Sequence, residues 1–481
     1  MHPIFKDLQE FIKALEAAGE LVRIAEPVSP ELEIAEITCR VSHSHGPALL
    51  FENVSGGSMP VLTNAFGSLK RMCMAFGISD LDSLASDVLD FIDLEDPAGY
   101  CSRHAIDMYA GKINPVRPIP VSSAPCQERV FVGDEVDLAM LPVLKCWPSD
   151  GGPSLTMPVV LTRDPETGVR NAGVYRMQVY GRNRTGMHWY ASRGGARHYR
   201  SAERLNEPLE AAVCIGPDPV TTYAATAPLP DGIDELLFAG FIRHDSVELV
   251  KCRTVDMEVP AQSQIVLEGF LAPGERLPEG PFGNHTGCYS PVEEYPVFHV
   301  TCMTMKKSPV YQATVAGPPP QEDCFMAKAT ERLFLPLIKR TVPGVVDVNL
   351  PIEGIFGNLA FVSIDKRFPG HARKVMNALW GHFLGTWRII CVFDRDVDVQ
   401  DMTQVLWRLG NNIDPKRDVC FTDGPVDILA WSAPFPGYGS RMGIDCTVTW
   451  DEEGGRPCPG TMEMDPAVRQ RVDLLWSRLG L

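Results

Sequence analysis

Short β-rich runs recur between turn signals from Val130 to about Thr314, and this pattern constrains the fold more than any other feature of the chain. The clearest runs cover residues 159–161, 174–180, 265–270 and 297–303. Short strands that alternate with turns are typical of antiparallel sheets. We therefore expect a mainly antiparallel β domain in the middle of the chain, closed into a barrel.

The regions before and after this stretch are typical of α/β units. Residues 7–18 carry apolar side chains at helical spacing, with Asp7 and Glu10 placed as a capping box and Gly19 as a stop. A second helix opens at Ser29-Pro30-Glu31, and strands at 48–51 and 61–62 and helices near 68–76 and 81–92 follow. Beyond about residue 320 a strand at 360–364, a helix from Gly370 to about Leu384 and a strand at 389–393 alternate again.

A proline-rich linker separates the first unit from the β-rich region. Four prolines break any periodic pattern between Gly111 and Pro125, namely Pro115, Pro118, Pro120 and Pro125. The sequence thus predicts an α+β protein with three domains, which we place at residues 1–112, 113–320 and 321–481.

Composition excludes several classes of protein. The formal net charge of −17 would repel a polyanion, so nucleic acid is not an expected partner. Every apolar run is interrupted well before the roughly 18 residues of a membrane helix, and the N-terminus lacks an export signal, so we expect a cytoplasmic protein without a membrane span. The 14 cysteines include no C-x2-C pair and are expected to be reduced, buried thiols.

Two stretches combine glycine with polar side chains suited to chemistry. The first joins Cys146–Pro153, Asn171–Arg176 and Arg193–Gly195, where glycine pairs allow close approach and Asn and Arg side chains suit a metal and an anion. The second, Leu277–Gly287, places a carboxylate, an amide and an imidazole on a loop stiffened by proline. Taken alone, the first stretch could be a barrel corner with a surface arginine, and the second a structured turn with a hydrogen-bonded histidine.

Taken together, these stretches resemble the UbiD family of decarboxylases over nearly the whole chain. The resemblance rests on ordered motifs: C-W-P-x-D-x-x-P at 146–153, N-x-G-x-Y-R-x-Q at 171–178, R-G-G at 193–195, V-K-C at 250–252, V-P-A at 259–261, E-G-P-F-G at 279–283, G-P-P at 317–319, G-H-A at 370–372 and G-S-R-M-G at 439–443. It implies a central FMN-binding split β-barrel and a C-terminal α/β oligomerisation domain.

The resemblance also implies prenylated FMN as the cofactor, with its phosphate held by Mn²⁺ or Mg²⁺ and a nearby K⁺. By position Asn171 and Glu235 match the metal ligands, and both offer the hard oxygens that these ions prefer. Read alone, Glu235 would be an exposed acid at a helix start. The third ligand stays open between His188 and His198, and carbonyls at 225–227 are placed to meet the potassium.

Further cofactor contacts follow from the same match. They are Thr156, Val174, Tyr175, Arg176, His188, Trp189, Tyr190, Arg193 and Gly194. Backbone amides and an arginine suit the flavin edge and its phosphate. For Trp189 and Tyr190 simple core packing is the alternative.

In the family a Glu-Arg-Glu or Glu-Arg-Asp network forms the reaction centre, and Arg176 and Glu279 match its first two members. The second acid is replaced by Asn284, whose amide cannot deliver a proton at neutral pH. The proton donor is therefore Glu279, His285 or water, and His285 fits by its ordinary pKa.

The implied reaction is reversible, non-oxidative decarboxylation of an aromatic or heteroaromatic carboxylic acid through a covalent adduct between substrate and prenylated FMN. Expected partners are the acid and CO2, a flavin prenyltransferase that supplies the cofactor, and further copies of this chain in a dimer or hexamer. Asn284 beside His285 favours a ring with its own hydrogen-bonding group, such as a phenol or a pyrrole N–H. Two alternatives are a subunit of an aromatic carboxylase or aryl-acyl-CoA decarboxylase complex, and a flavin-binding assembly subunit without turnover.

Overall fold

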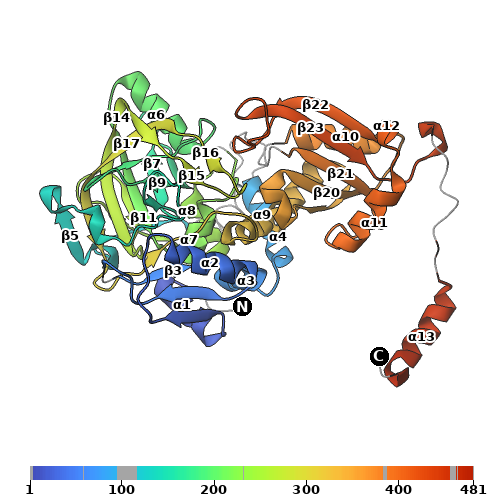
Figure 1. Ribbon diagram of the computed structural model, residues 1–481, viewed down its shortest axis with the longest axis horizontal. Coiled ribbons are helices and arrows are strands. Elements are labelled where there is room, and N and C mark those ends of the chain that lie inside the picture. Colours follow the sequence, from blue (N-terminus) through green and yellow to red (C-terminus); the bar gives the residue numbers. More distant parts are fainter. Residues whose placement is uncertain are drawn as a thin grey trace.

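The computed structural model describes residues 4–57, 59–94, 116–230, 232–382, 387–454, 462 and 464–479. Helices and strands form a mixed α+β fold in three regions that follow the sequence, from blue through green and yellow to red in Figure 1. The expected first domain boundary at 112/113 lies outside the described residues. No described helix is both long and apolar enough to cross a bilayer, and every cysteine among the described residues is free.

The N-terminal region begins with the expected amphipathic helix, α1 (Leu8–Ala17). Asp7 caps it by accepting a hydrogen bond from the Glu10 backbone N–H at 2.8 Å. The expected capping box is only half formed, because the Glu10 carboxylate accepts from the Lys6 N–H instead. The following elements are β1 (Leu21–Ile24), α2 (Glu33–His43), β2 (Ala48–Phe51), β3 (Val61–Thr63), α3 (Leu69–Phe76) and α4 (Asp82–Leu94). Helix α2 thus begins later than the Ser29-Pro30-Glu31 signal suggested.

The N-terminal sheet contains a strand that arrives from far along the chain. Its order is β1-β2-β3-β18, and β18 (Tyr311–Gln312) pairs in parallel with β3. Side chains of the N-terminal and central regions also form one hydrophobic cluster, in which Leu8 and Phe11 join Val159 and Leu161. The N-terminal and central regions therefore share a sheet and a hydrophobic cluster.

The central region is antiparallel, as the β-rich runs predicted. A seven-stranded sheet has the order β10-β17-β14-β11-β7-β8, and β5 also pairs with β17. No hydrogen-bonded pair among the described strands joins β10 to β8, so closure into a split barrel stays a prediction. The seven strands are β5 (Arg129–Val132), β7 (Val159–Arg163), β8 (Arg170–Val174), β10 (Arg184–Gly186), β11 (Leu209–Ile215), β14 (Ile265–Glu279) and β17 (Glu293–Met305).

Shorter elements surround this sheet. The helices are α6 (Gly194–Leu205), α7 (Pro219–Ala224) and α8 (Glu235–Arg243). The small strands are β4 (Ile119–Val121), β6 (Ser154–Leu155), β9 (Met177–Gln178), β12 (Glu248–Lys251), β13 (Glu258–Pro260), β15 (Phe282–Gly283) and β16 (Tyr289–Ser290). Strand β14 matters most for the site, because it runs from the core and ends at Glu279.

The C-terminal region is a five-stranded mixed sheet with helices, in the order β19-β20-β21-β23-β22. Helix α10 begins where Gly370 predicted it but ends at Trp380, and Leu384 lies outside the described residues. The elements are α9 (Glu322–Thr341), β19 (Val345–Asn349), the 3-10 helix η5 (Ile352–Gly357), β20 (Leu359–Ile364), α10 (His371–Trp380), β21 (Ile389–Asp394), α11 (Met402–Asn412), α12 (Pro415–Asp418), β22 (Val419–Pro425), β23 (Tyr438–Asp445) and α13 (Pro466–Leu479).

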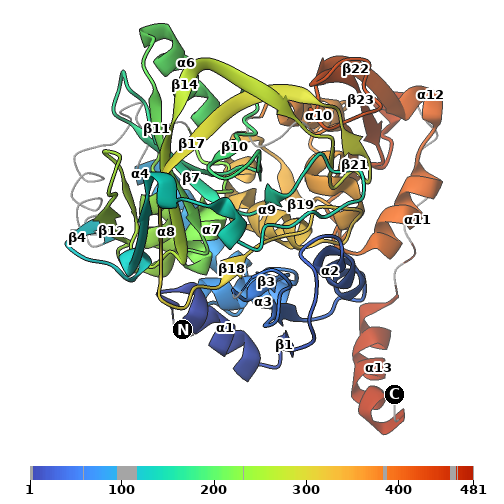
Figure 2. The ribbon, with the colours of Figure 1, turned by 60° about the vertical axis from the view of Figure 1, so that its left-hand side comes forward.

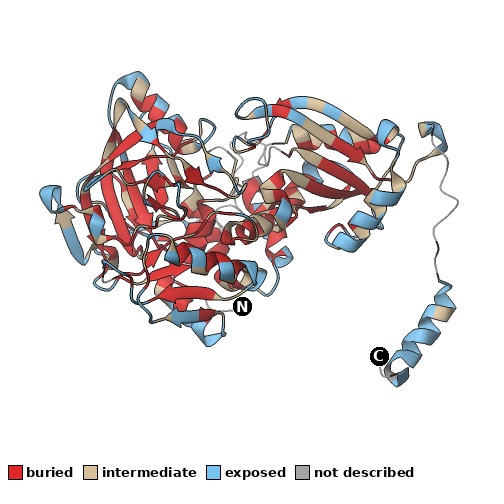
Figure 3. Cartoon of the chain, in the orientation of Figure 1, coloured by how far each residue is buried: buried red, intermediate tan, exposed pale blue. Residues whose placement is uncertain are grey.

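Helix α9 connects the regions. It packs against α3 and α4 on one side and against β19 and η5 on the other. The core is buried throughout, whereas α13 is mostly exposed and stands apart from the rest in two views (Figures 1, 2 and 3).

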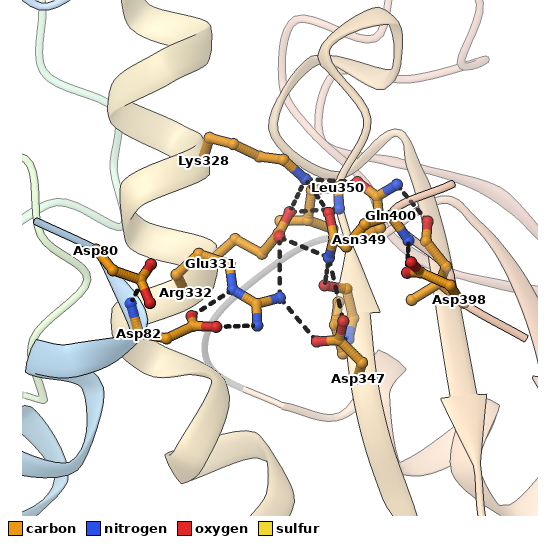
Figure 4. Close-up of polar contacts among 12 residues, drawn as sticks. Asp80, Asp82, Lys328, Glu331, Arg332, Asp347, Asn349, Leu350, Asp398 and Gln400 are labelled. Atoms are coloured by element: carbon orange, nitrogen blue, oxygen red, sulfur yellow. Dashed lines mark hydrogen bonds and ion pairs between the residues drawn. The ribbon is translucent and has the colours of Figure 1, made fainter. Parts of the chain in front are cut away.

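A network of charged side chains fixes α9 to its neighbours (Figure 4). Arg332 bridges Asp82 of α4 and Asp347 of β19, with an N–O distance of 2.7 Å to each. The buried Glu331 carboxylate accepts from the Leu350 N–H at 2.6 Å and pairs with Lys328 at 2.7 Å. The network thus holds the segment that leads into η5.

Candidate active site

The two glycine-rich stretches singled out in the sequence lie against each other. The buried Asp150 carboxylate joins them, because Oδ1 accepts from the Gly283 N–H at 2.8 Å and Oδ2 from the Trp147 N–H at 2.9 Å. Gln178 adds a second link, since its Oε1 accepts from the Gly280 N–H at 2.8 Å. Asp150 and Gln178 therefore hold the loop that follows Glu279 in place.

The Trp147 ring explains two of the glycines. A Cβ on Gly283 would lie 2.3 Å from Trp147 Cδ1, and one on Gly317 would lie 2.6 Å from Cζ2. The indole N–H donates to the Ala316 carbonyl at 2.8 Å. The Trp147 ring thus packs between three motifs, in a space that is available because residues 283 and 317 are both glycine.

At the end of β14, Glu279 forms a buried charge cluster with Arg176 and His188. Glu279 Oε1 accepts from Arg176 at 2.8 Å and lies 2.8 Å from His188 Nδ1. The Arg176 guanidinium also lies over the Phe282 ring, 3.8 Å from its centroid. The glutamate side chain is fully buried, so Arg176 is its main charge partner and is held in a fixed orientation.

This cluster keeps unused hydrogen-bonding capacity. Glu279 Oε2, His188 Nε2 and the Tyr180 hydroxyl are buried without a hydrogen-bond partner among the described residues. Burial lowers the pKa of His188, and its hydrogen bond with Glu279 opposes this shift. Burial raises the pKa of Tyr180, and the Glu279 charge adds to the rise. Buried groups without partners are costly, so the cluster has the character of a binding site.

A second centre is a cleft of about 160 Å³ beside the start of α8. It gathers both predicted metal ligands, the predicted phosphate contacts and the predicted potassium turn: Asn171, Glu235, Arg193, Gly194 and residues 225–227. Glu235 Oε2 accepts from the Ala172 N–H at 3.0 Å, which places the carboxylate next to Asn171.

The donors of this cleft fit a hard divalent cation. A Cβ on Gly194 would lie 1.9 Å from Asn171 Oδ1, so glycine makes room for the amide oxygen. Burial raises the pKa of Glu235 to about 8, a cost that a bound cation would remove. Among the described residues no three or more His, Cys, Asp and Glu side chains gather as a metal site, so Asn171 and Glu235 would supply only part of a coordination shell.

The loop after Glu279 presents His285 rather than Asn284. Asn284 Oδ1 accepts from the Thr286 N–H at 3.0 Å and from its hydroxyl at 2.6 Å, so this oxygen is turned back on its own loop. The His285 ring lies 4.7 Å from the Phe356 ring of η5, and its Nδ1 lies 4.0 Å from Asp323 Oδ2. Burial lowers the pKa of His285, and the Asp427 carboxylate opposes this shift.

Three family models match the chain in order. They describe the 3-octaprenyl-4-hydroxybenzoate carboxy-lyase N-terminal domain over residues 12–88, the Rift-related domain over 118–319 and the C-terminal domain over 324–446. The chain belongs to the UbiD family. A protein of Aquifex aeolicus, named only as uncharacterized, is 48% identical to this chain, and the match covers 99% of each of the two chains.

Solved UbiD-class structures are similar over the whole length. The enzyme HmfF from Pelotomaculum thermopropionicum in complex with FMN is 30% identical, with a TM-score of 0.82 over 96% of this chain and 98% of that one. Vanillic acid decarboxylase from Sedimentibacter hydroxybenzoicus in its closed form is 29% identical, with a TM-score of 0.86 over 99% of each chain. The open form of that enzyme gives 0.80, so the present arrangement is more similar to the closed form.

The remaining residues expected from the UbiD resemblance are two that lie near the cleft and three that contact other side chains or backbone groups. Val174 and Tyr175 lie near the cleft: the Val174 N–H donates to the Ala225 carbonyl at 3.2 Å, and the Tyr175 hydroxyl lies 3.5 Å from Asn171 Nδ2. Trp189 is buried between the rings of Tyr175 and Tyr199. Thr156 accepts from the Thr314 N–H, and Tyr190 contacts the His188 ring with a centroid distance of 4.9 Å.

The two histidines considered as a third ligand separate clearly. His188 lies in the Glu279 cluster, whereas His198 lines the cleft beside α8. The His198 ring is already engaged, because its Nδ1 lies 2.9 Å from the Thr162 hydroxyl. The third ligand of the expected metal therefore stays open.

Sequence reasoning missed several residues of this UbiD site. Tyr180 stands two residues after the N-x-G-x-Y-R-x-Q motif, in a β-rich run that gave no sign of a role in the site. Asp323, Phe356 and Asp427 come from segments more than 35 residues beyond His285, so only folding brings them to it. The acid pair Glu322-Asp323, shortly after the G-P-P motif, is a sequence signal that could have indicated Asp323.

Proposed function

We propose that this chain is a prenylated-FMN-dependent carboxy-lyase that reversibly decarboxylates an aromatic or heteroaromatic acid. The observation that supports this most is the buried Arg176–Glu279–His188 cluster in a UbiD fold, with a separate oxygen-lined cleft beside it. Two solved relatives are named for aromatic acids, vanillic acid at 29% identity and 3,4-dihydroxybenzoic acid at 24%. The second supports only the fold.

The cleft residues would hold the cofactor's phosphate end. Asn171 and Glu235 would ligate Mn²⁺ or Mg²⁺, Arg193 and the Gly194 backbone would contact phosphate oxygens, and carbonyls at 225–227 would meet K⁺. When bound, prenylated FMN supplies the electron sink that an sp² carbon needs in order to release CO2.

The chain's own residues would position the acid and manage its proton. Arg176 can bind the substrate carboxylate through the guanidinium edge that Glu279 leaves free, because the Phe282 ring supports the guanidinium face. Glu279 keeps this arginine in place, and the ion pair with Arg176 offsets the cost of burying the Glu279 carboxylate. After CO2 leaves, the same carbon must receive a proton, for which His285, Glu279 and water are the candidate donors.

The test is turnover of protein coexpressed with a flavin prenyltransferase. We expect CO2 release, or deuterium exchange at the product carbon, from at least one member of a panel of phenolic, pyrrole, indole and furan carboxylic acids. Protein carrying ordinary FMN serves as the control and should be inactive. Full turnover with FMN alone, or no exchange with any acid at full loading with prenylated FMN, would contradict the proposal.

A further inference from the structure

His285 is surrounded by groups from elements far apart in the sequence. Asp323, the second residue of α9, faces its Nδ1, and Phe356 of η5 covers its ring. Among the described residues no hydrogen bond is made by either ring nitrogen of His285. The ring is therefore held by packing while its nitrogens remain free for a reaction.

Asp323 is a carboxyl group with unused capacity. Its Oδ1 is buried without a hydrogen-bond partner among the described residues, and the side chain as a whole remains 25% exposed. Burial raises the pKa of Asp323 to about 7, and the Glu322 charge adds to this against hydrogen bonds from Cys324. A carboxyl group with a raised pKa that lies 4.0 Å from a histidine nitrogen and is partly exposed to solvent is suited to pass protons.

The backbone of η5 explains why the imidazole keeps this orientation. Ile355 and Phe356 have φ angles of 44° and 56°, in the left-handed region that β-branched and aromatic residues rarely adopt. Such conformations persist where the surroundings hold them, and here the Glu331–Leu350 hydrogen bond fixes the chain just before η5. The result is an edge contact at 68° between the Phe356 and His285 rings.

We propose that Asp323 is a positioning residue that supplies His285 with the proton given to the reacting carbon. The inference rests on the proposed decarboxylation and assigns its proton path. The Nε2–H bond of His285 breaks as the new C–H bond forms, and Nδ1 takes the proton of the Asp323 carboxylic acid. The Asp323 carboxylate then regains a proton from water, the hydroxide combines with the released CO2 as bicarbonate, and the imidazole returns to its Nε2–H form by proton exchange with solvent. Asp323 thereby takes the part of the acid that Asn284 replaces.

Among the residues that the structure describes, two charged groups face His285, Asp323 from α9 and Asp427 from the segment after β22, and both are acids. An acid beside an imidazole stabilises its protonated form, so removing either should lower the pKa of His285. Asp323 Oδ2 lies 4.0 Å from Nδ1 of His285, close enough for one water or a small shift to complete the path.

The first experiment needs no cofactor and therefore stands apart from the proposed function. Histidine side-chain NMR of the full chain would follow the His285 pKa in wild type, Asp323→Asn and Asp323→Ser. We expect the pKa of His285 to fall by about one unit in both variants, and to return in Asp323→Glu. An unchanged His285 pKa in both folded variants would overturn the proposal, whatever the enzyme's activity.

The second experiment uses the protein loaded with prenylated FMN. Asp323→Asn should slow protonation of the product carbon by about 10-fold or more, measured by deuterium incorporation, while KM changes little. In a His285→Gln background the same change should have no further effect, because both residues serve one path. Independent, multiplicative losses would overturn the relay, whereas inactivity of wild type on every acid would instead count against the proposed function.

Discussion

Glu279 is the residue whose replacement should tell most about the site. We expect Glu279→Gln to lower decarboxylation by at least about 100-fold, because Arg176 and His188 lose the buried charge that orients them. Steady-state CO2 release checks this. Glu275→Gln is a matched control, since Glu275 lies on the same strand and also pairs with a histidine, His299, at 2.7 Å. Equal losses in both variants would mean that the cluster is only structural.

At the cleft, the test is joint loss of metal and flavin. Asn171→Ala and Glu235→Ala should each release both together, because one cation would bridge these oxygens to the cofactor phosphate. Metal content by mass spectrometry and flavin absorbance measure the two ligands, with the exposed Glu166→Ala as control. Folded variants that retain both would reject these residues as ligands.

The proton donor can be separated from its neighbours by two substitutions. His285→Ala should slow decarboxylation by about 100-fold if the imidazole donates the proton, and Asn284→Asp should keep activity by restoring an acid. Single-turnover assays compare the variants. Wild-type rates in His285→Ala, with Glu279→Gln inactive, would assign protonation to Glu279 or water.

Residue patterns predicted part of this site and could not predict the rest. The motif match brought Arg176 and Glu279 together in advance, but it left His188 among the cofactor contacts. Its pairing with Glu279 depends on how β10 delivers residue 188 to the end of β14, which no local spacing encodes. For the same reason Asp323 and Phe356 were missed.

At the scale of elements, glycine positions test how the motifs pack. Gly283→Ala should destabilise the protein by about 1–3 kcal/mol, because its Cβ would overlap the Trp147 ring. Gly410→Ala in α11 is the control: a Cβ there meets nothing within 4 Å, and alanine favours a helix by about 0.5–1 kcal/mol. Chemical denaturation measures both, and similar values would contradict the close packing.

Helix and strand boundaries were predictable where periodicity was strong. The helices predicted at residues 7–18 and near 68–76 and 81–92 correspond to α1, α3 and α4 within two residues at each end. Strand β18 was missed because two residues carry no period, and its partner β3 lies some 250 residues away. The end of α10 was placed too late because apolar residues continue past Trp380.

At the scale of the molecule, Arg332 should control how the C-terminal region meets the rest. We expect Arg332→Met to favour a more open arrangement, seen as a larger radius of gyration in solution scattering, because it breaks the bridge between Asp82 and Asp347. The exposed Arg23→Met, which breaks two surface pairs, is the control and should change nothing.

The same bridge gives a pH dependence. The hydrogen bond from Arg332 lowers the pKa of Asp82, so the bridge contributes fully above about pH 4, the ordinary carboxyl pKa, and is lost as the pH falls through the lowered pKa. Scattering at pH 7 and in steps from pH 4 downward would measure this in wild type. A scattering profile independent of pH and of Arg332 would assign closure to other contacts.

We also expect the protein to assemble into a dimer or hexamer. Helix α13 leaves apolar side chains in solvent, with Leu474 76% and Trp476 52% exposed, which an assembly could cover. Light scattering at micromolar concentration measures the mass. A monomer would contradict the expectation.

The pairing of β18 with β3 constrains the order in which this protein folds during its synthesis. At the ribosome β3 emerges early, but the strand that covers its edge is made only about 250 residues later. At usual rates of synthesis this leaves the edge waiting for roughly ten seconds or more. During that time the unpaired edge of β3 can form hydrogen bonds with strands of other chains. A chaperone that covers such edges on nascent chains should therefore raise the yield of folded protein.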